Sequence, residues 1–247
     1  MKKLFLTLIA LAATMSINAQ IVKIMNGDQL VVRHKVPNGG KVVFEKAPDL
    51  GIKGKAERTG GIEVNWVQLW EGGPRFAEYN VGAANNKAED YGAYYSFGKI
   101  TTDKDNYYNG NMALTGDDDT ATKLWGDNWR MPTKKEFEAL INNENCTCTW
   151  IANYEGKDVN GLLCTGKAGT AFAANSVFLP AAGYFDNRNG GDFYDQGTRG
   201  TYWSSTPVYN REDFAWVLNF HSENSESQKV FEYGRGTGYS VRAVLVE

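Results

Sequence analysis

Short apolar segments separated by glycine and asparagine turns fill the second half of the chain, and this pattern limits the folds open to it. Segments this short, bounded by turn residues, are typical of β-strands. The segments that we expect to be strands are 147–153, 161–165, 176–179, 200–204, 214–220, 227–232 and 240–246. A domain built from them carries many loops at the tips of its strands.

Helices are expected in two places before these strands. The clearest is 133–143, where Thr133 and Glu136 form a capping box, each side chain binding a backbone donor at the start of the helix. A shorter helix is expected at 119–124, because the acidic run 117–119 places negative charge at its N-terminus. Few helices followed by many short strands predict an α+β domain with long loops.

The start of the chain has the features of a secretion signal. Lys2 and Lys3 precede an apolar run at 4–13, and the small residue Ala19 follows before the expected cut. The apolar run is too short to span a bilayer, although a buried N-terminal helix is an alternative. We therefore expect residues 1–19 to be a signal peptide and the mature protein to be exported, with no membrane insertion after cleavage. Its address would be the periplasm, the cell surface or the medium.

Three further parts follow the signal peptide. Residues 20–46 contain apolar or alternating stretches and Asn-Gly and Gly-Gly turns, which predict a small β-meander. Residues 47–61 are rich in lysine, glycine and charge, which predicts a linker. Residues 62–247 are long enough to form one domain with a sizeable core.

The composition excludes some classes of partner. The formal net charge is −3, whereas a nucleic-acid-binding protein needs a clustered basic face. Aromatic residues make up 13% of the chain and glycines number 27. Many aromatic rings among many turns indicate a loop-rich fold, a binding face, or both. We expect no nucleic-acid partner and no cofactor.

The three cysteines point to one disulfide. Cys146 and Cys148 are too close in sequence to pair easily, and export permits disulfides. We favour a Cys148–Cys164 bond, because a turn near 155–159 would bring these residues opposite each other; three free thiols are the alternative. The two histidines lie far from the cysteines in sequence, and the acidic run 117–119 lacks the spacing of a calcium loop. We therefore expect no metal site.

The sequence gives little support for a catalytic site. A Ser-His-Asp triad would have to combine His221 with Ser204 or Ser205, which are better explained as part of a packed strand edge. Acidic residues such as Asp192 and Asp213 fall on loops, where they are expected to be solvated rather than paired for glycoside hydrolysis. We expect no enzymatic activity.

Polar and aromatic residues gather in the loops that follow the late strands. Tyrosine, asparagine and arginine are favoured by adaptable recognition surfaces, and tyrosine offers flat area to sugars or to protein partners. The candidate ligand-binding residues are Tyr184, Arg188, Tyr194, Arg199, Tyr209, Arg211, Asn219, His221, Tyr233 and Arg235. We expect loops 184–199, 208–213 and 221–239 to form one face that binds a glycan or a protein surface. The alternative is that part of the tyrosines only pack the loops onto the core.

Trp125, Trp129, Arg130, Trp203, Trp216 and Arg242 are expected to be structural. Trp203 and Trp216 lie in predicted strands. Arg130 and Arg242 are expected to donate hydrogen bonds to loop carbonyls.

Several sequence blocks occur in order and together resemble a known family. They lie at 66–74, 79–83, 90–98, 125–133, 178–184, 202–205 and 240–242. The pattern resembles the Fibrobacter succinogenes major paralogous (FISUMP) type of domain of Bacteroidetes, over about residues 62–247. That group is similar to C-type-lectin-like and formylglycine-generating-enzyme-like folds.

The resemblance implies a C-type-lectin-like α+β domain with long loops, preceded by the β-meander. Formylglycine-generating enzymes use a redox-active cysteine pair late in the domain, but here no cysteine follows Cys164. We therefore expect an exported, non-enzymatic binding module. Two alternatives remain open: a structural or assembly subunit of a surface appendage or envelope complex, and a degenerate enzyme of the formylglycine-generating type.

Overall fold

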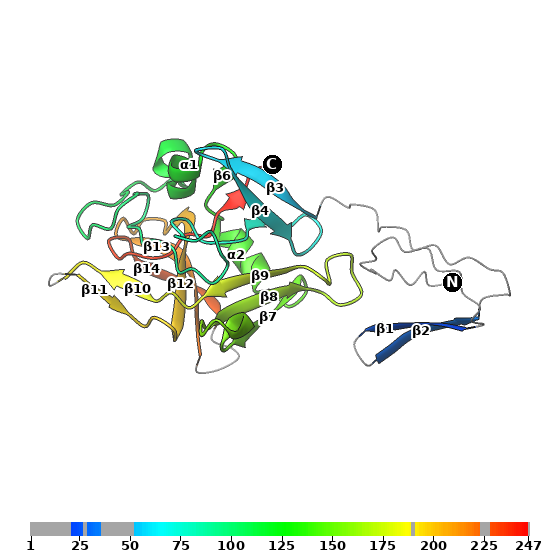
Figure 1. The fold of residues 1–247 in the computed structure, drawn as a ribbon. Helices are drawn as coiled ribbons and strands as arrows, with labels where there is room; N and C mark the ends of the chain where they lie inside the picture. The colour runs from blue at the N-terminus through cyan, green and yellow to red at the C-terminus, as the bar shows by residue number, and fades with distance from the viewer. Residues whose placement is uncertain (1–20, 27–28, 36–51, 189–190, 223–227, 247) are drawn as a thin grey trace. The chain divides into compact units, whose positions relative to one another are not determined.

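The computed structural model describes residues 21–26, 29–35, 52–188, 191–222 and 228–246, which form two compact units, Met1–Leu50 and Gly51–Glu247 (Figure 1). In the first unit, β1 (Ile21–Asn26) and β2 (Gln29–Lys35) pair antiparallel, with Ile21 opposite Lys35. The part of the expected β-meander after residue 35 and the expected signal peptide at 1–19 lie outside the described residues. No helix in the described part of the chain is long and apolar enough to cross a membrane.

The second unit is mostly β, so our prediction of an α+β, C-type-lectin-like fold is wrong. Strands account for 38% of the structure and helices for 11%. Among the described residues, α-helix is confined to α1 (Thr120–Trp125) and α2 (Lys134–Leu140). Both predicted helices are present, but each is short. Gly126, with φ of +90°, ends α1, and α2 ends at Ile141, a few residues before the next strand.

The starts of both helices follow the sequence. The backbone N–H of Glu136 donates to Thr133 Oγ1 at 3.2 Å, and the N–H of Thr133 donates to Glu136 Oε2 at 2.7 Å, which completes the predicted capping box. Asp119 caps α1 by accepting from the backbone N–H groups of Ala121 and Thr122. Thus the acidic run supplies the N-terminal cap of α1.

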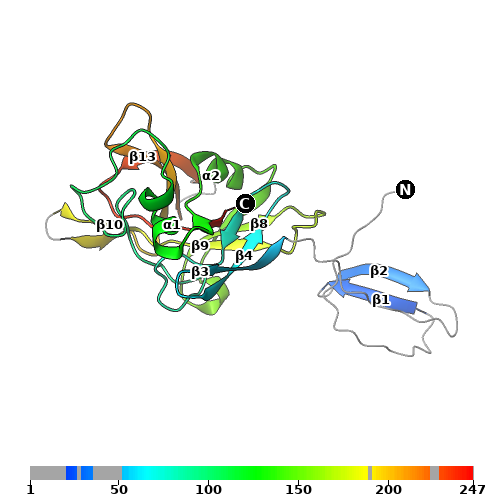
Figure 2. The ribbon, with the colours of Figure 1, turned by 90° about the horizontal axis from the view of Figure 1, so that it is seen from above.

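A five-stranded sheet joins the beginning of the second unit to its end (Figure 2). Its order is β3 (Lys53–Arg58), β4 (Ile62–Gln68), β5 (Arg75–Ala77), β15 (Val244–Leu245) and β6 (Trp129–Arg130). Strand β3 falls within the stretch expected to be a linker at 47–61. Its residues alternate between exposed and half-buried positions and pair antiparallel with β4, so this part of the stretch belongs to the sheet.

The late strands form antiparallel hairpins and meanders. One sheet contains β7 (Cys146–Ile151), β8 (Gly161–Gly166) and β9 (Ser176–Pro180). A second contains β12 (Arg199–Pro207), β13 (Phe214–His221) and β14 (Lys229–Gly234), and a small ribbon contains β10 (Tyr184–Asp186) and β11 (Asp192–Tyr194). Of the predicted strands, 240–246 deviates most, because only Val244–Leu245 is a strand. Short 3-10 helices lie at Gly116–Asp118 and Tyr154–Gly156.

Two fully buried side chains hold segments that are distant in sequence. Trp203 packs against Phe97 and Tyr239 and donates from Nε1 to the carbonyl of Tyr95 at 2.7 Å. Arg242 donates to the carbonyl oxygens of Ala77, Glu78 and Phe178 and to Asn80 Oδ1. We predicted that Arg242 donates to loop carbonyls; it does donate to carbonyls, but those of Ala77 and Phe178 lie in the strands β5 and β9.

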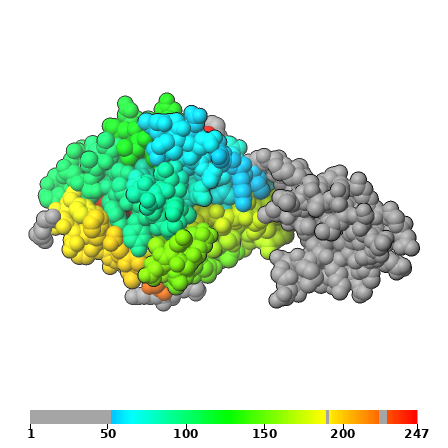
Figure 3. All heavy atoms as spheres, viewed as in Figure 1, coloured from blue at the N-terminus to red at the C-terminus, as the bar shows by residue number. Residues whose placement is uncertain are grey.

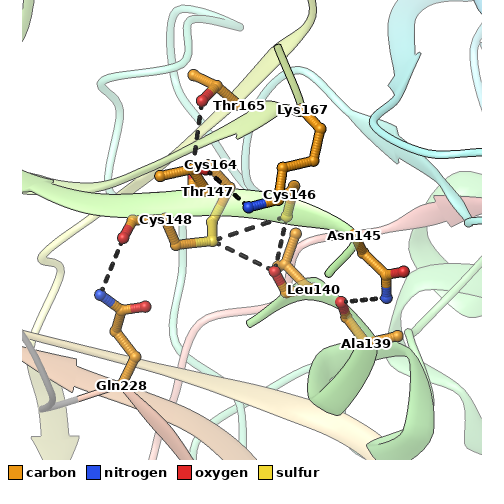
Figure 4. Close-up of a disulfide and its surroundings, with 10 residues drawn as sticks. All are labelled: Ala139, Leu140, Asn145, Cys146, Thr147, Cys148, Cys164, Thr165, Lys167 and Gln228. Carbon is orange, nitrogen blue, oxygen red and sulfur yellow. Dashed lines mark hydrogen bonds between the residues drawn. A yellow bond between two sulfur atoms is a disulfide. The ribbon is translucent and has the colours of Figure 1, made fainter. Parts of the chain in front are cut away.

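The structure joins Cys148 and Cys164, the pair favoured from the sequence (Figure 4). These residues lie directly opposite each other in the β7–β8 register. Cys146 is a buried free thiol whose Sγ lies 4.0 Å from Cys148 Sγ and donates to the carbonyl of Leu140. Burial raises the pKa of the Cys146 thiol to about 11, so this thiol stays protonated near neutral pH.

Candidate functional site

A cleft of about 630 Å³ lies where β10, β12 and β14 meet the loop before α1. We call it the tyrosine cleft. Its lining is formed by Lys104, Asp105, Tyr107, Tyr184, Asp186, Arg188, Arg199, Thr201, Asp213, Tyr233, Gly234, Arg235, Gly236, Thr237 and Tyr239. The lining combines aromatic rings, hydroxyls and charges of both signs.

The rings form a connected group. Tyr184, on β10, stacks on Tyr194 of β11 with ring centres 5.3 Å apart. The ring of Tyr239 contacts Tyr184 and Tyr233 edge-to-face, at 6.1 Å and 5.5 Å. Tyr239 is also the ring on which the buried Trp203 packs. The buried Trp203 therefore holds the ring of Tyr239 in place in the lining of the cleft.

The charged groups of the cleft are held by neighbours of opposite charge. Arg188 donates from Nε to Asp186 Oδ1 at 2.9 Å, and this hydrogen bond lowers the pKa of the Asp186 carboxyl. Arg199 forms an ion pair with Asp195 at 3.0 Å. These ion pairs thus hold hydrogen-bonding groups in place at the rim of the cleft.

Tyr107 and Asp213 close the other side. The Tyr107 hydroxyl donates to Asp213 Oδ1 at 2.9 Å, and this bond raises the pKa of Tyr107. The segment that carries Tyr107 approaches very closely, because a Cβ on Gly236 would lie 2.3 Å from the carbonyl oxygen of Lys104. A side chain at position 236 would push this wall of the cleft away.

Arg235, which we predicted as a ligand-binding residue, lines the cleft and also holds its wall together. Its side chain is fully buried. It donates from Nε to the carbonyl of Phe214 at 2.8 Å, and from Nη1 to the carbonyls of Tyr108 and Gly110 at 2.8 Å and 2.9 Å. Burial lowers its pKa. Arg235 therefore pins the 108–110 loop to the sheet and shapes the cleft wall.

The structure brings most of the other predicted residues to this region. Tyr184, Arg188, Arg199 and Tyr233 line the cleft. Three predicted residues lie next to it: Tyr194, Asn219 and His221. Asn219 is buried and donates from Nδ2 to Thr201 Oγ1 at 3.0 Å, while His221 borders a neighbouring hollow together with Arg199.

Tyr209 and Arg211 do not line the tyrosine cleft. Tyr209 is 78% exposed on the turn between β12 and β13. Arg211 forms an ion pair with Glu232, and its guanidinium lies 3.8 Å from the centre of the Phe214 ring. Loop 208–213 contributes only Asp213 to the cleft.

Sequence reasoning missed the contribution of an early segment. Lys104, Asp105 and Tyr107 line the cleft but lie in a polar stretch that precedes the strands by about 80 residues along the chain. The adjacent residues Tyr107 and Tyr108 could have indicated this contribution, since two tyrosines in a polar loop need a surface to pack on.

Two features of the described residues bear on metal sites and on the cysteine pair of formylglycine-generating enzymes. No group of three or more histidine, cysteine or acidic side chains in this part of the chain is arranged to hold a metal ion. Cys164 is fully buried and bonded to Cys148, so its thiol is not free for the chemistry of formylglycine-generating enzymes.

One family model matches the chain. It is described as the Lcl C-terminal domain, and it matches residues 86–245. No curated protein and no solved structure matches the chain. The matched range contains every residue that lines the tyrosine cleft. The match is to a domain of Lcl-type surface proteins and does not extend to the FISUMP type.

Proposed function

Because the chain belongs to the Lcl C-terminal domain family, whose members are surface proteins, we propose that it is an exported, non-enzymatic module that binds a glycan in the tyrosine cleft. The observation that carries the proposal is the concave group of tyrosine rings, Tyr184, Tyr233 and Tyr239, bordered by fixed charges.

The chemistry of the lining suits a sugar. A tyrosine ring covers the C–H face of a sugar ring, and its hydroxyl still reaches solvent or a hydrogen-bond partner. The sugar hydroxyls both donate and accept. Asp186 and Asp213 can accept from them, while Arg188 and Arg199 can donate to them. A glycan therefore satisfies both kinds of group in the same cleft.

The size of the cleft favours a glycan over a protein surface. A volume of about 630 Å³ lies within the range of about 300–1,000 Å³ that is usual for small-molecule sites. Stable protein–protein interfaces instead bury about 800 Å² on each partner and are flatter than a cleft. A short oligosaccharide is the better fit.

The electrostatics support binding without catalysis. A general acid needs a carboxyl whose pKa is raised toward the working pH. The hydrogen bond from Arg188 lowers the pKa of Asp186 instead, and Asp213 is held by the Tyr107 hydroxyl. Both carboxylates are suited to accept hydrogen bonds from a ligand.

The test is a glycan array probed with the full chain, followed by calorimetry on each glycan that binds. Tyr184→Ala and Tyr233→Ala should weaken binding at least about tenfold, since anchoring aromatic side chains each contribute more than 1.4 kcal/mol at such sites. The matched control is Tyr209→Ala, because Tyr209 is exposed and lies outside the cleft. Equal binding by all three variants and the unaltered protein would refute the proposal.

A second candidate function is assembly through the N-terminal hairpin. Within the described residues, β1 and β2 form a two-stranded sheet, and the outer edge of each strand has no partner. A free edge can accept a strand from another chain. Deletion of residues 21–35 should then lower the oligomeric mass in light scattering and leave glycan binding intact. Unchanged mass would exclude this role for the hairpin.

A further inference from the structure

A second, smaller cavity lies beside α1 and the end of β3, away from the tyrosine cleft. Its volume is about 210 Å³, and Arg58, Tyr79, Gly82, Asn86, Tyr95 and Trp125 are among its lining residues. It shares no lining residue with the tyrosine cleft. In Figure 3, β3 (cyan) and β10 (yellow) lie apart on the face shown, with residues 80–110 (teal) between them.

Two buried hydrogen-bonding groups at this cavity have no partner. Tyr79 is only 3% exposed, and its hydroxyl makes no hydrogen bond. Arg58 Nε is buried and equally without a partner. Tyr95 also lines the cavity, and its side chain is 4% exposed. Buried polar groups are almost always satisfied in native proteins, so two exceptions around one cavity call for a ligand.

The unsatisfied groups can all donate hydrogen bonds. Arg58 is a permanent cation, and no carboxylate in the described residues lies within ion-pair distance of it. Its Nη2 donates to the Asn86 amide oxygen at 3.4 Å, and its guanidinium lies 5.6 Å from the centre of the Trp125 ring. Both tyrosine hydroxyls can donate as well. The natural complement is an anion with several acceptor lone pairs.

The hydroxyl of Tyr95 is kept as a donor. Burial raises its pKa to about 12, so it carries its proton at neutral pH. Gly82, with φ of +78°, leaves room for it, because a Cβ there would lie 2.7 Å from the Tyr95 hydroxyl oxygen. Any other residue at position 82 would push against this group.

The cavity also has an apolar part and a limited size. Trp125 and Leu124 from α1, together with Val81, supply apolar surface. A volume of 210 Å³ corresponds to about seven water molecules at about 30 Å³ each. This space admits a small molecule with a short apolar tail and is too small for an oligosaccharide.

We propose that this cavity binds a small free monocarboxylate. Its carboxylate accepts hydrogen bonds from Arg58 Nε and from the hydroxyls of Tyr79 and Tyr95, and its tail lies against Trp125. Arg58 and Tyr79 precede the range 86–245 matched by the family model. The site therefore includes residues outside the matched range, and it does not depend on the proposed glycan binding.

The test uses the full chain titrated with butyrate, followed by calorimetry and by the NMR signal of the Trp125 indole. Butyramide, which has the same shape without the charge, is the matched probe. We expect saturable butyrate binding that shifts the Trp125 signal, and butyramide binding at least about tenfold weaker, the size of one hydrogen bond to a charged group.

Three variants make the test specific. Arg58→Gln and Tyr79→Phe should each weaken butyrate binding about tenfold or more. Arg75→Gln is the control, because Arg75 also lies over a tryptophan, 4.9 Å from the ring centre of Trp66, and also has a partnerless Nε, but does not line the cavity. Tyr79→Phe removes only an unbonded hydroxyl, so it keeps the fold if Arg58→Gln does not. Absent saturation, equal binding of both probes, or an effect of Arg75→Gln as large as the others would overturn the proposal.

Discussion

Replacement of Trp203 tests how the core supports the tyrosine cleft. Trp203 is fully buried on β12, between Phe97 and Tyr239, with ring centres 5.3 Å and 4.8 Å away. Trp203→Ala removes the indole and leaves a cavity, which costs about 3–5 kcal/mol. It also leaves the carbonyl of Tyr95 without the indole N–H, which adds about 1 kcal/mol. The expected total is roughly 4–6 kcal/mol.

Thermal unfolding followed by circular dichroism measures this loss. For a protein of this size each kcal/mol lowers the midpoint by about 2–4 °C, so a fall of roughly 10–20 °C is expected. Trp203→Phe should lose much less, because the ring still fills most of the space. Trp216→Ala is the matched control, since Trp216 is only half-buried on the neighbouring strand β13 and its ring lies under Lys134. Equal losses for Trp203→Ala and Trp216→Ala would refute the assigned packing role.

Three other changes should each raise or lower the free energy of unfolding in a direction that the structure predicts. Reduction of the Cys148–Cys164 bond opens a closed segment with a sequence separation of 16 and should lower the free energy of unfolding by about 3 kcal/mol, as measured in urea with and without reductant. Burial alone would raise the pKa of Glu136, but hydrogen bonds from Arg130 and from the helix N-terminus lower it below 4.5. Its stabilising contribution is therefore full above pH 4.5 and is lost as the pH falls through the lower folded-state pKa. Glu136→Gln should cost about 1 kcal/mol at pH 7 and progressively less below pH 4.5; a difference independent of pH in urea titrations would contradict this. Tyr79→Phe removes an unbonded buried hydroxyl and should raise the free energy of unfolding by about 1 kcal/mol, the opposite of what a structural hydroxyl would give.

Local signals in the sequence predicted the elements well. The capping box of Thr133 and Glu136 and the acidic cap at Asp119 depend on neighbours within a few residues, and both are present. The late strands are bounded by turn residues, and their ranges closely match β7, β8, β9, β12, β13 and β14. These features are encoded over short stretches, where a pattern can be read without knowing the partners.

Pairing between distant segments could not be read in the same way. Strand β3 is charged and glycine-containing, so it resembles a linker until its partner β4 is known. The fold class failed for the same reason: the ribbon of β10 and β11 is built from residues that looked like an irregular recognition loop. Arg235 illustrates the limit for site residues. An arginine in a late loop looks available to a ligand, and only the positions of Tyr108 and Gly110 show that its Nη1 donates inside the protein, while its Nη2 is buried without a partner.

The segment 239–243 connects the tyrosine cleft to the smaller cavity. Tyr239 and Tyr95 exchange backbone hydrogen bonds at 3.1 Å and 3.0 Å, and the next residues bind the backbones of Trp203 and Val81. Tyr239 lines the tyrosine cleft, and Tyr95 lines the smaller cavity. One bridge between two chain segments therefore forms part of the wall of each site. The position of Tyr239 is set by the buried Trp203 on one side and by Tyr95 on the other, so a change in the core at this point should disturb both sites, whereas a change in a loop tip such as Tyr209 should disturb neither.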